Sequence, residues 1–125
     1  MISQQWGDNV RKLADLKVPY RCNSSDMVYK IMLCSDKDGT FVFLYTSPDA
    51  VRCSFDEWYP DEESAIEAWQ ESVDENGWQD IGDPMPHCQQ DALLPIRVKG
   101  RDKGKPEWGC LEIYENGAWR DCVPK

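Results

Sequence analysis

Two apolar runs on either side of a polar turn constrain the fold of this chain more than any other feature. Residues 27–34 and 41–45 are strand-like, and the second run is apolar at successive positions. Such a run is typical of a central strand that is covered on two sides. Residues 35–39 between them contain Ser, Asp, Lys and Gly, which favour a tight turn. The two runs therefore predict an antiparallel hairpin within a sheet.

A second hairpin is predicted near the C-terminus. Asn116-Gly117 is the strongest short hairpin signal, and strand-like segments flank it at 108–114 and 118–122. The register of such a hairpin places Tyr114 opposite Trp119, which is a favourable aromatic pair.

Two helices are expected from apolar residues at helical spacing. In residues 3–16 these are Trp6, Val10, Leu13 and Leu16. A second helix is predicted over 61–76, with Pro60 suited to its start and Gly77 to its C-terminal cap. Its apolar stripe consists of Ala65, Ile66, Trp69 and Val73.

Further strands are expected at 51–58 and 93–99, with an irregular segment at 78–92. The order has no alternation of strand and helix of the kind that builds parallel sheets. We therefore expect one α+β domain over residues 1–125, mostly an antiparallel sheet of five to six strands with one or two helices packed on one face.

The charge of the chain is concentrated in one stretch. Between Arg52 and Arg97 there is no Lys or Arg, and residues 53–96 contain twelve Asp or Glu. The chain carries a formal charge of −9, so the remainder sums to +3. An acidic surface repels nucleic acids and anionic membranes and attracts basic proteins. Direct nucleic-acid or membrane binding is therefore not expected.

Four glutamates within this stretch are spaced at i,i+4 along the predicted second helix: Glu63, Glu67, Glu71 and Glu75. Each such pair of like charges costs roughly 0.2–0.5 kcal/mol. Asp74 adds to the charge near the helix C-terminus, where acids are unfavourable. Carboxylates one turn apart lie about 6 Å apart along the axis, on the scale of the phosphate spacing of a nucleic-acid strand. The pattern favours a nucleic-acid mimic, whereas a face that only confers solubility is the alternative.

Catalytic chemistry finds little support in the sequence. His87 is the only histidine, and its neighbour Cys88 is the candidate for a cysteine-dependent enzyme. The spacing of His and Cys does not suit a zinc site, and the Gly100–Lys105 segment lacks the spacing of a phosphate-binding loop. We expect no enzyme activity, no metal and no cofactor.

The six cysteines are expected to be reduced. The N-terminal residues do not follow the pattern of a signal peptide, and no apolar run approaches the roughly 20 residues of a membrane span. These features predict a cytoplasmic protein, in which cysteines are mostly small apolar side chains.

In size, charge and tryptophan content the chain resembles the small acidic immunity proteins of bacteria and phage-type inhibitors of nucleic-acid enzymes. The resemblance implies a binding protein that neutralises or regulates a basic partner. The alternatives are an enzyme built around Cys88 and His87 and an oligomerising scaffold. The residues expected to contact the partner are Glu63, Glu67, Glu71, Asp74 and Glu75, with Asp56, Glu57, Trp58 and Asp80 as neighbours.

Overall fold

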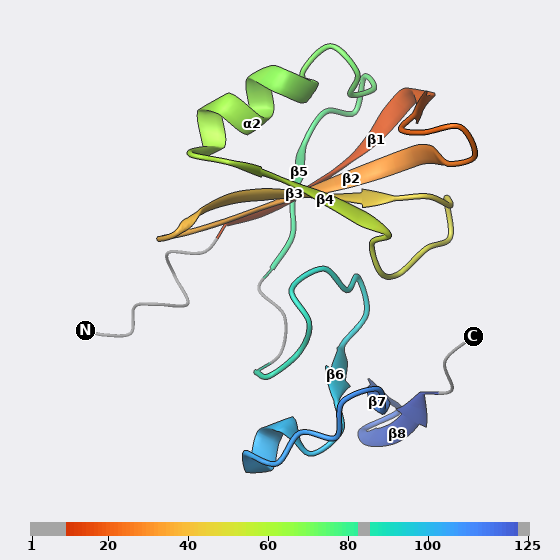
Figure 1. The fold of residues 1–125 in the computed structure, drawn as a ribbon, viewed down its shortest axis with the longest axis vertical. Coiled ribbons are helices and arrows are strands. Elements are labelled where there is room, and N and C mark those ends of the chain that lie inside the picture. Colours follow the sequence, from red (N-terminus) through yellow and green to blue (C-terminus); the bar gives the residue numbers. More distant parts are fainter. Residues whose placement is uncertain (1–9, 83–85, 123–125) are drawn as a thin grey trace. The chain divides into compact units, whose positions relative to one another are not determined.

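The computed structural model describes residues 10–82 and 86–122 of the chain (Figure 1). These residues form two compact units, Met1–Asp83 and Pro84–Lys125. The single domain expected over residues 1–125 stays a prediction.

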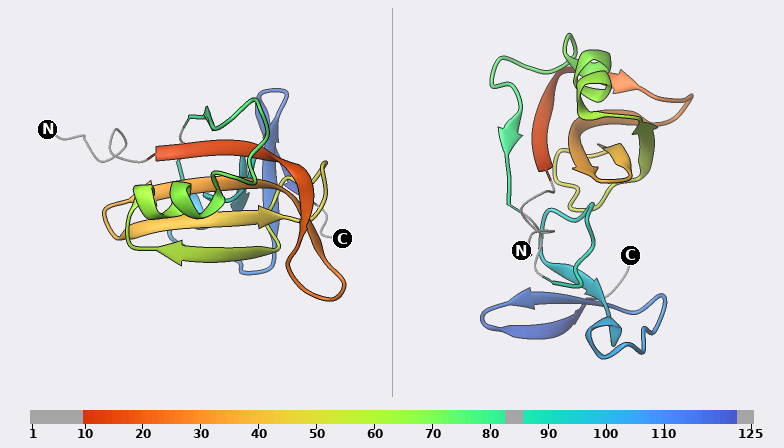
Figure 2. Two further views of the ribbon diagram at one scale, coloured as in Figure 1. Left: turned by 90° about the horizontal axis from the view of Figure 1, so that it is seen from above. Right: turned by 90° about the vertical axis from the view of Figure 1, so that its left-hand side faces the viewer.

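Unit 1 is a five-stranded antiparallel sheet with one helix on one face. The strands and the helix are β1 (Val10–Arg21), β2 (Met27–Asp36), β3 (Gly39–Tyr45), β4 (Phe55–Tyr59), α2 (Glu62–Trp69) and β5 (Gln79–Asp80). The spatial order is β4-β3-β2-β1-β5, so the first four strands form a meander. The chain then crosses one sheet face through α2 and reaches the opposite edge at β5 (Figures 1 and 2).

The first predicted hairpin is confirmed. β2 and β3 pair along their length, and the register ends at the turn where Asp36 faces Gly39. β3 lies between two other strands, as the apolar run predicted. Val42 and Leu44 are buried on the face that α2 covers, whereas Phe41 and Phe43 are half-buried on the other.

The predicted N-terminal helix is wrong for its described part, because residues 10–16 belong to β1. Residues 3–9 lie outside the described chain. Val10, Ala14 and Leu16 pack into the core of unit 1, and their spacing by even numbers is the two-residue period of a strand. β1 is also paired on both sides, with β2 and with β5, and this pairing outweighs the local helical pattern.

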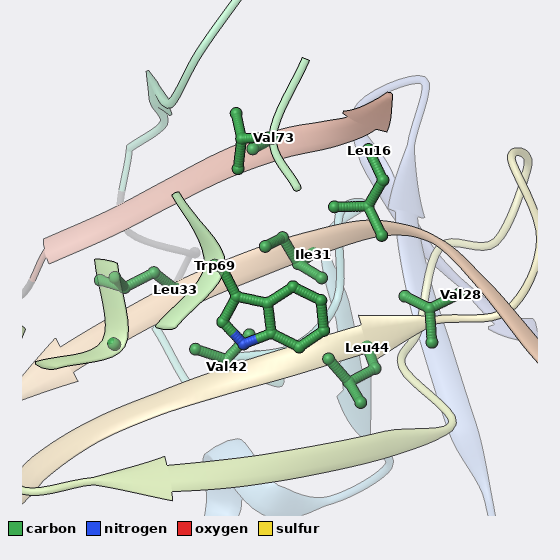
Figure 3. Packing of buried hydrophobic residues seen from close by; sticks show 10 residues of the cluster. Leu16, Val28, Ile31, Leu33, Val42, Leu44, Trp69 and Val73 are labelled. Carbon is green, nitrogen blue, oxygen red and sulfur yellow. The ribbon is translucent and has the colours of Figure 1, made fainter. Parts of the chain in front are cut away.

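The hydrophobic core of unit 1 lies between α2 and the sheet. Ala65 and Trp69 of the helix belong to the same buried cluster as Ile31, Val42 and Leu44 of the strands. Figure 3 shows the Trp69 ring lying over β2 and β3 among these aliphatic side chains. Trp69 is therefore a core residue, as expected.

The helix begins as predicted but ends earlier. Asp61 is its N-cap and accepts a hydrogen bond from the Ser64 backbone N–H at 2.8 Å. The helix ends at Trp69 and not at the predicted Asn76. The helix ends here because the following residues pair with the backbone of β1. The Lys17 N–H donates to the Ser72 carbonyl at 2.9 Å, and Val73 forms an antiparallel β-bridge with Leu16.

Unit 2 contains a three-stranded antiparallel sheet in the order β6-β7-β8. Its elements are β6 (Ile96–Val98), a 3₁₀ turn η1 (Arg101–Lys103), β7 (Leu111–Glu115) and β8 (Ala118–Cys122). Asn116 and Gly117 have φ of 55° and 81°, the positive values of a two-residue hairpin turn. Tyr114 and Trp119 meet with ring centroids 5.3 Å apart, so the second predicted hairpin is confirmed.

The predicted α+β chain with mostly antiparallel strands is confirmed in outline. A sheet of five strands with one helix on one face is present in unit 1. The prediction missed the division into two sheets, because it assigned all strands to one sheet. Nothing in the strand pattern of 96–122 identifies which sheet those strands join.

Candidate interaction surface

The negative charge of the chain resides in unit 1. Over Met1–Asp83 the sequence has seven Lys or Arg and seventeen Asp or Glu, a net charge of −10. Over Pro84–Lys125 it has seven Lys or Arg and six Asp or Glu, a net charge of +1. Unit 1 is therefore the part of the chain that attracts positively charged molecules.

Two of the four predicted glutamates lie on α2 itself. Glu63 and Glu67 are exposed and one turn apart, and Glu71 is exposed in the turn that follows the helix. Among the described residues none of these three carboxylates forms an ion pair, whereas Glu62 pairs with Lys12 at 3.4 Å. These carboxylates are therefore free to meet a cationic surface.

The prediction that the four glutamates follow one another along a single helix is wrong, because the helix ends before Glu71 and Glu75. Glu75 is exposed but lies in a separate turn. Asp74 is half-buried in the same turn, where its carboxylate accepts from the Asn76 N–H at 2.9 Å and its own N–H donates to the Asp15 carbonyl at 2.9 Å. The main role of Asp74 is therefore to hold this turn against β1.

Glu57 is turned inward and has a structural role. Its Oε1 accepts a hydrogen bond from the Tyr59 hydroxyl at 2.6 Å and one from the Trp69 indole N–H at 3.2 Å. Burial and, after it, the hydrogen bond to Glu57 raise the pKa of Tyr59 to about 12. This carboxylate anchors β4 to α2 and is not available to a partner.

Asp56 and Trp58 lie on the sheet face opposite α2, because neighbouring residues of a strand point to opposite faces and Glu57 points to the helix. Both are exposed, and Trp58 retains 55% of its accessible surface. Its ring lies against the backbone of Gly39 at the β2–β3 turn. Trp58 is therefore an accessible aromatic side chain beside a carboxylate, as an interface anchor requires.

Asp80 lies at the other edge of the sheet. It belongs to β5, opposite Lys12 of β1, and its side chain is exposed. The nine predicted residues thus fall into separate places: the α2 side, the opposite face of β4, the far edge, and the interior in the case of Glu57.

One exposed residue at this surface was missed by the sequence reasoning. Phe55 begins β4 and is 39% exposed, although large apolar side chains are mostly buried. The sequence predicted a strand over 51–58 but did not predict that Phe55 is exposed. Its position on the outermost strand became visible only once the strand order was known.

The candidate dyad does not have the geometry of a catalytic pair. Cys88 is 6% exposed, and its backbone forms an antiparallel β-bridge with that of Arg97. His87 is exposed and has a φ of 69°. A buried thiol is a poor nucleophile for a substrate in solution. In the described ranges no group of three or more His, Cys, Asp or Glu side chains is placed to hold a metal ion.

Comparison with known proteins returned no matching family, no matching curated protein and no matching solved structure. Within residues 10–82 and 86–122, no helix has the length and apolar character needed to cross a membrane.

Proposed function

We propose that this chain is a non-enzymatic binding protein that neutralises or regulates a basic protein partner, in the manner of an immunity protein or an inhibitor of a nucleic-acid enzyme. The partner is a protein with a positively charged groove or face, and the contact is made by unit 1. No cofactor or metal takes part.

The observation that carries the proposal is the set of exposed carboxylates without ion pairs on and after α2. Glu63, Glu67 and Glu71 lie in succession on a unit of net charge −10. A protein selected for stability alone would gain by placing Lys at one of these positions, because opposite charges at i,i+4 stabilise a helix. A partner that requires the three acids would explain their presence here.

The reduced state of the cysteines favours a partner in the cytoplasm. Cys22 and Cys110 are free thiols, a state that is maintained in a reducing compartment. A basic toxin or nuclease of the same compartment is the partner that these properties suit.

The test is capture of partners from a lysate of the source organism by three versions of the protein. These are the wild type, E63K/E67K, and the control D38K/D49K, which has the same change in net charge on two exposed loop positions. Bound proteins are eluted with a salt gradient and identified by mass spectrometry. We expect one basic protein to bind the wild type and the control, to be lost with E63K/E67K, and to elute at moderate salt.

Retention of the same partner by E63K/E67K would contradict the proposal. Equal loss from both variants would also contradict it, since overall charge and not this surface would then explain the binding. Circular dichroism of the variants verifies that they fold, which we expect because Glu63 and Glu67 are exposed.

A further inference from the structure

β4 is the outermost strand of the five-stranded sheet, and its outer edge is open among the described residues. It pairs only with β3, through residues Phe55–Tyr59. Figure 2 shows β4 along the free margin of the sheet in the view from above. Every second residue of such a strand directs its backbone N–H and carbonyl outward, without a partner.

This edge has five residues and neither a Lys nor a Pro. Edge strands are commonly protected by charged side chains, an internal Pro, a covering helix or loop, or very short length. The charges of β4 are exposed Asp56 and inward-turned Glu57, both acidic, so they oppose pairing with an acidic chain but not with a basic one. The other edge strand, β5, has only two residues.

The charge beside the edge selects what can pair with it. Asp56 is exposed on β4, and exposed Asp61 and Glu63 follow the strand after Pro60. A second copy of this chain is repelled, because its own unit 1 also carries a net charge of −10. A strand that carries Arg or Lys is attracted.

Trp58 adds a specific receptor for a cationic side chain. It lies on the same sheet face as Asp56, two positions away along the strand, and more than half of its surface is accessible. A partner strand can place one basic side chain over the Trp58 ring and another, two residues along, beside the Asp56 carboxylate. On the other face, exposed Phe55 offers an apolar contact.

We propose that β4 binds an extended, arginine-containing or lysine-containing segment of a protein partner by strand addition, as a sixth strand of the sheet. The inference rests on the proposed function, because it names how a basic partner is held. Backbone hydrogen bonds to β4 supply the pairing, and basic side chains at alternate positions meet Trp58 and Asp56. The carboxylates of α2 supply attraction over a longer range.

The experiment uses the full chain and a labelled nine-residue peptide of alternating Arg and Thr, capped at both ends. Two further peptides carry backbone N-methyl groups, one on the Arg residues and one on the Thr residues. Strand addition uses the N–H groups of one set only, so one methylated peptide should bind at least about tenfold more weakly than the other. Affinity is measured by fluorescence anisotropy, and amide shifts in NMR spectra locate the contact at 55–59.

Three variants separate the edge from the helix. W58A and D56N should each weaken binding of the unmethylated peptide by about three- to tenfold, through loss of the stacking or ion-pair contact. E63K/E67K should weaken binding of these short peptides less, and equally for all three, because a nine-residue strand on β4 meets the α2 carboxylates only through attraction over a longer range, unlike a whole partner that also contacts α2. D56N preserves the size of the side chain and serves if W58A does not fold.

Equal binding of the two methylated peptides would overturn strand addition. If, in that case, E63K/E67K abolished binding while W58A and D56N had no effect, the proposed function would stand with α2 as the contact. Absence of binding of the unmethylated peptide up to about 1 mM, the weak end of specific affinities, would overturn the inference as well. Loss of the natural partner in the capture experiment is a separate result and tests the proposed function alone.

Discussion

At the scale of single residues, Glu57 illustrates how a carboxylate within an acidic stretch acquires a structural role. Both neighbours of this side chain are exposed, whereas Glu57 accepts hydrogen bonds from Tyr59 and Trp69. A sequence shows the charge of a glutamate but not the donors it meets. The distinction became visible only through the pairing of β4 and the position of α2.

Replacement of this carboxylate should destabilise the protein. E57A leaves a partly buried hydroxyl and an indole N–H without their acceptor, which costs about 1–3 kcal/mol. E57Q keeps an acceptor oxygen and should lose less. The free energy of unfolding is measured by urea titration, with E63A as the exposed control that should change it by less than about 0.5 kcal/mol. Equal effects of E57A and E63A would contradict the role assigned to Glu57.

The hydrogen bond between Tyr59 and Glu57 should make the stability of the protein depend on pH in alkaline solution. Its pKa rises from an ordinary value of 10.0 to about 12 in the folded state. The folded protein therefore retains the phenolic proton when the unfolded chain has already lost it, so the stabilising contribution is complete below pH 10. It is lost as the pH rises from 10 to 12. Y59F should remove this part of the pH dependence, which unfolding measurements between pH 9 and about 12 can detect.

At the scale of elements, local sequence signals predicted the hairpins well and the helices poorly. The β2–β3 turn and the Asn116-Gly117 turn were found because the turn residues themselves set the backbone angles. The two ends of α2 are set in different ways. The start is set locally, by the Asp61 cap, whereas the end is set by pairing of residues 72–74 with β1. Pairing between distant segments leaves no local signal, and the same is true of the two-sided pairing of β1.

The β2–β3 turn depends on a glycine that also contacts the exposed tryptophan. Gly39 has a φ of +137°, and a Cβ placed there would lie 2.8 Å from Trp58 Cε2. We expect G39A to destabilise the protein by roughly 1–3 kcal/mol, from backbone strain together with displacement of the ring. In the double variant G39A/W58A the clash is absent, so the added cost of G39A should be smaller. Thermal unfolding of the four proteins gives this difference, and a cost of G39A independent of Trp58 would contradict the contact.

At the scale of the whole molecule, the separation of charge is the feature that the sequence predicted most directly. A run without Lys or Arg from 53 to 96 was visible in the sequence, and the structure assigns most of its acids to unit 1. The arrangement of those acids was not predictable, because it depends on the strand order and on which side of β4 meets the helix. Exposed Trp58 was a plausible anchor from sequence, but its accessibility required the sheet.

The open edge of β4 also bears on the colloidal behaviour of the protein. The sequence isoelectric point is about 4.5, so repulsion between copies vanishes at mildly acidic pH while the outer edge of β4 remains unpaired. We expect concentration-dependent aggregation there, measured by light scattering. F55K, which places a gatekeeper charge on β4, should suppress it more than W108K, which puts the same charge on an exposed residue of unit 2. We therefore expect the carboxylates that we propose attract a basic strand at neutral pH also to keep the protein from polymerising through its own sheet.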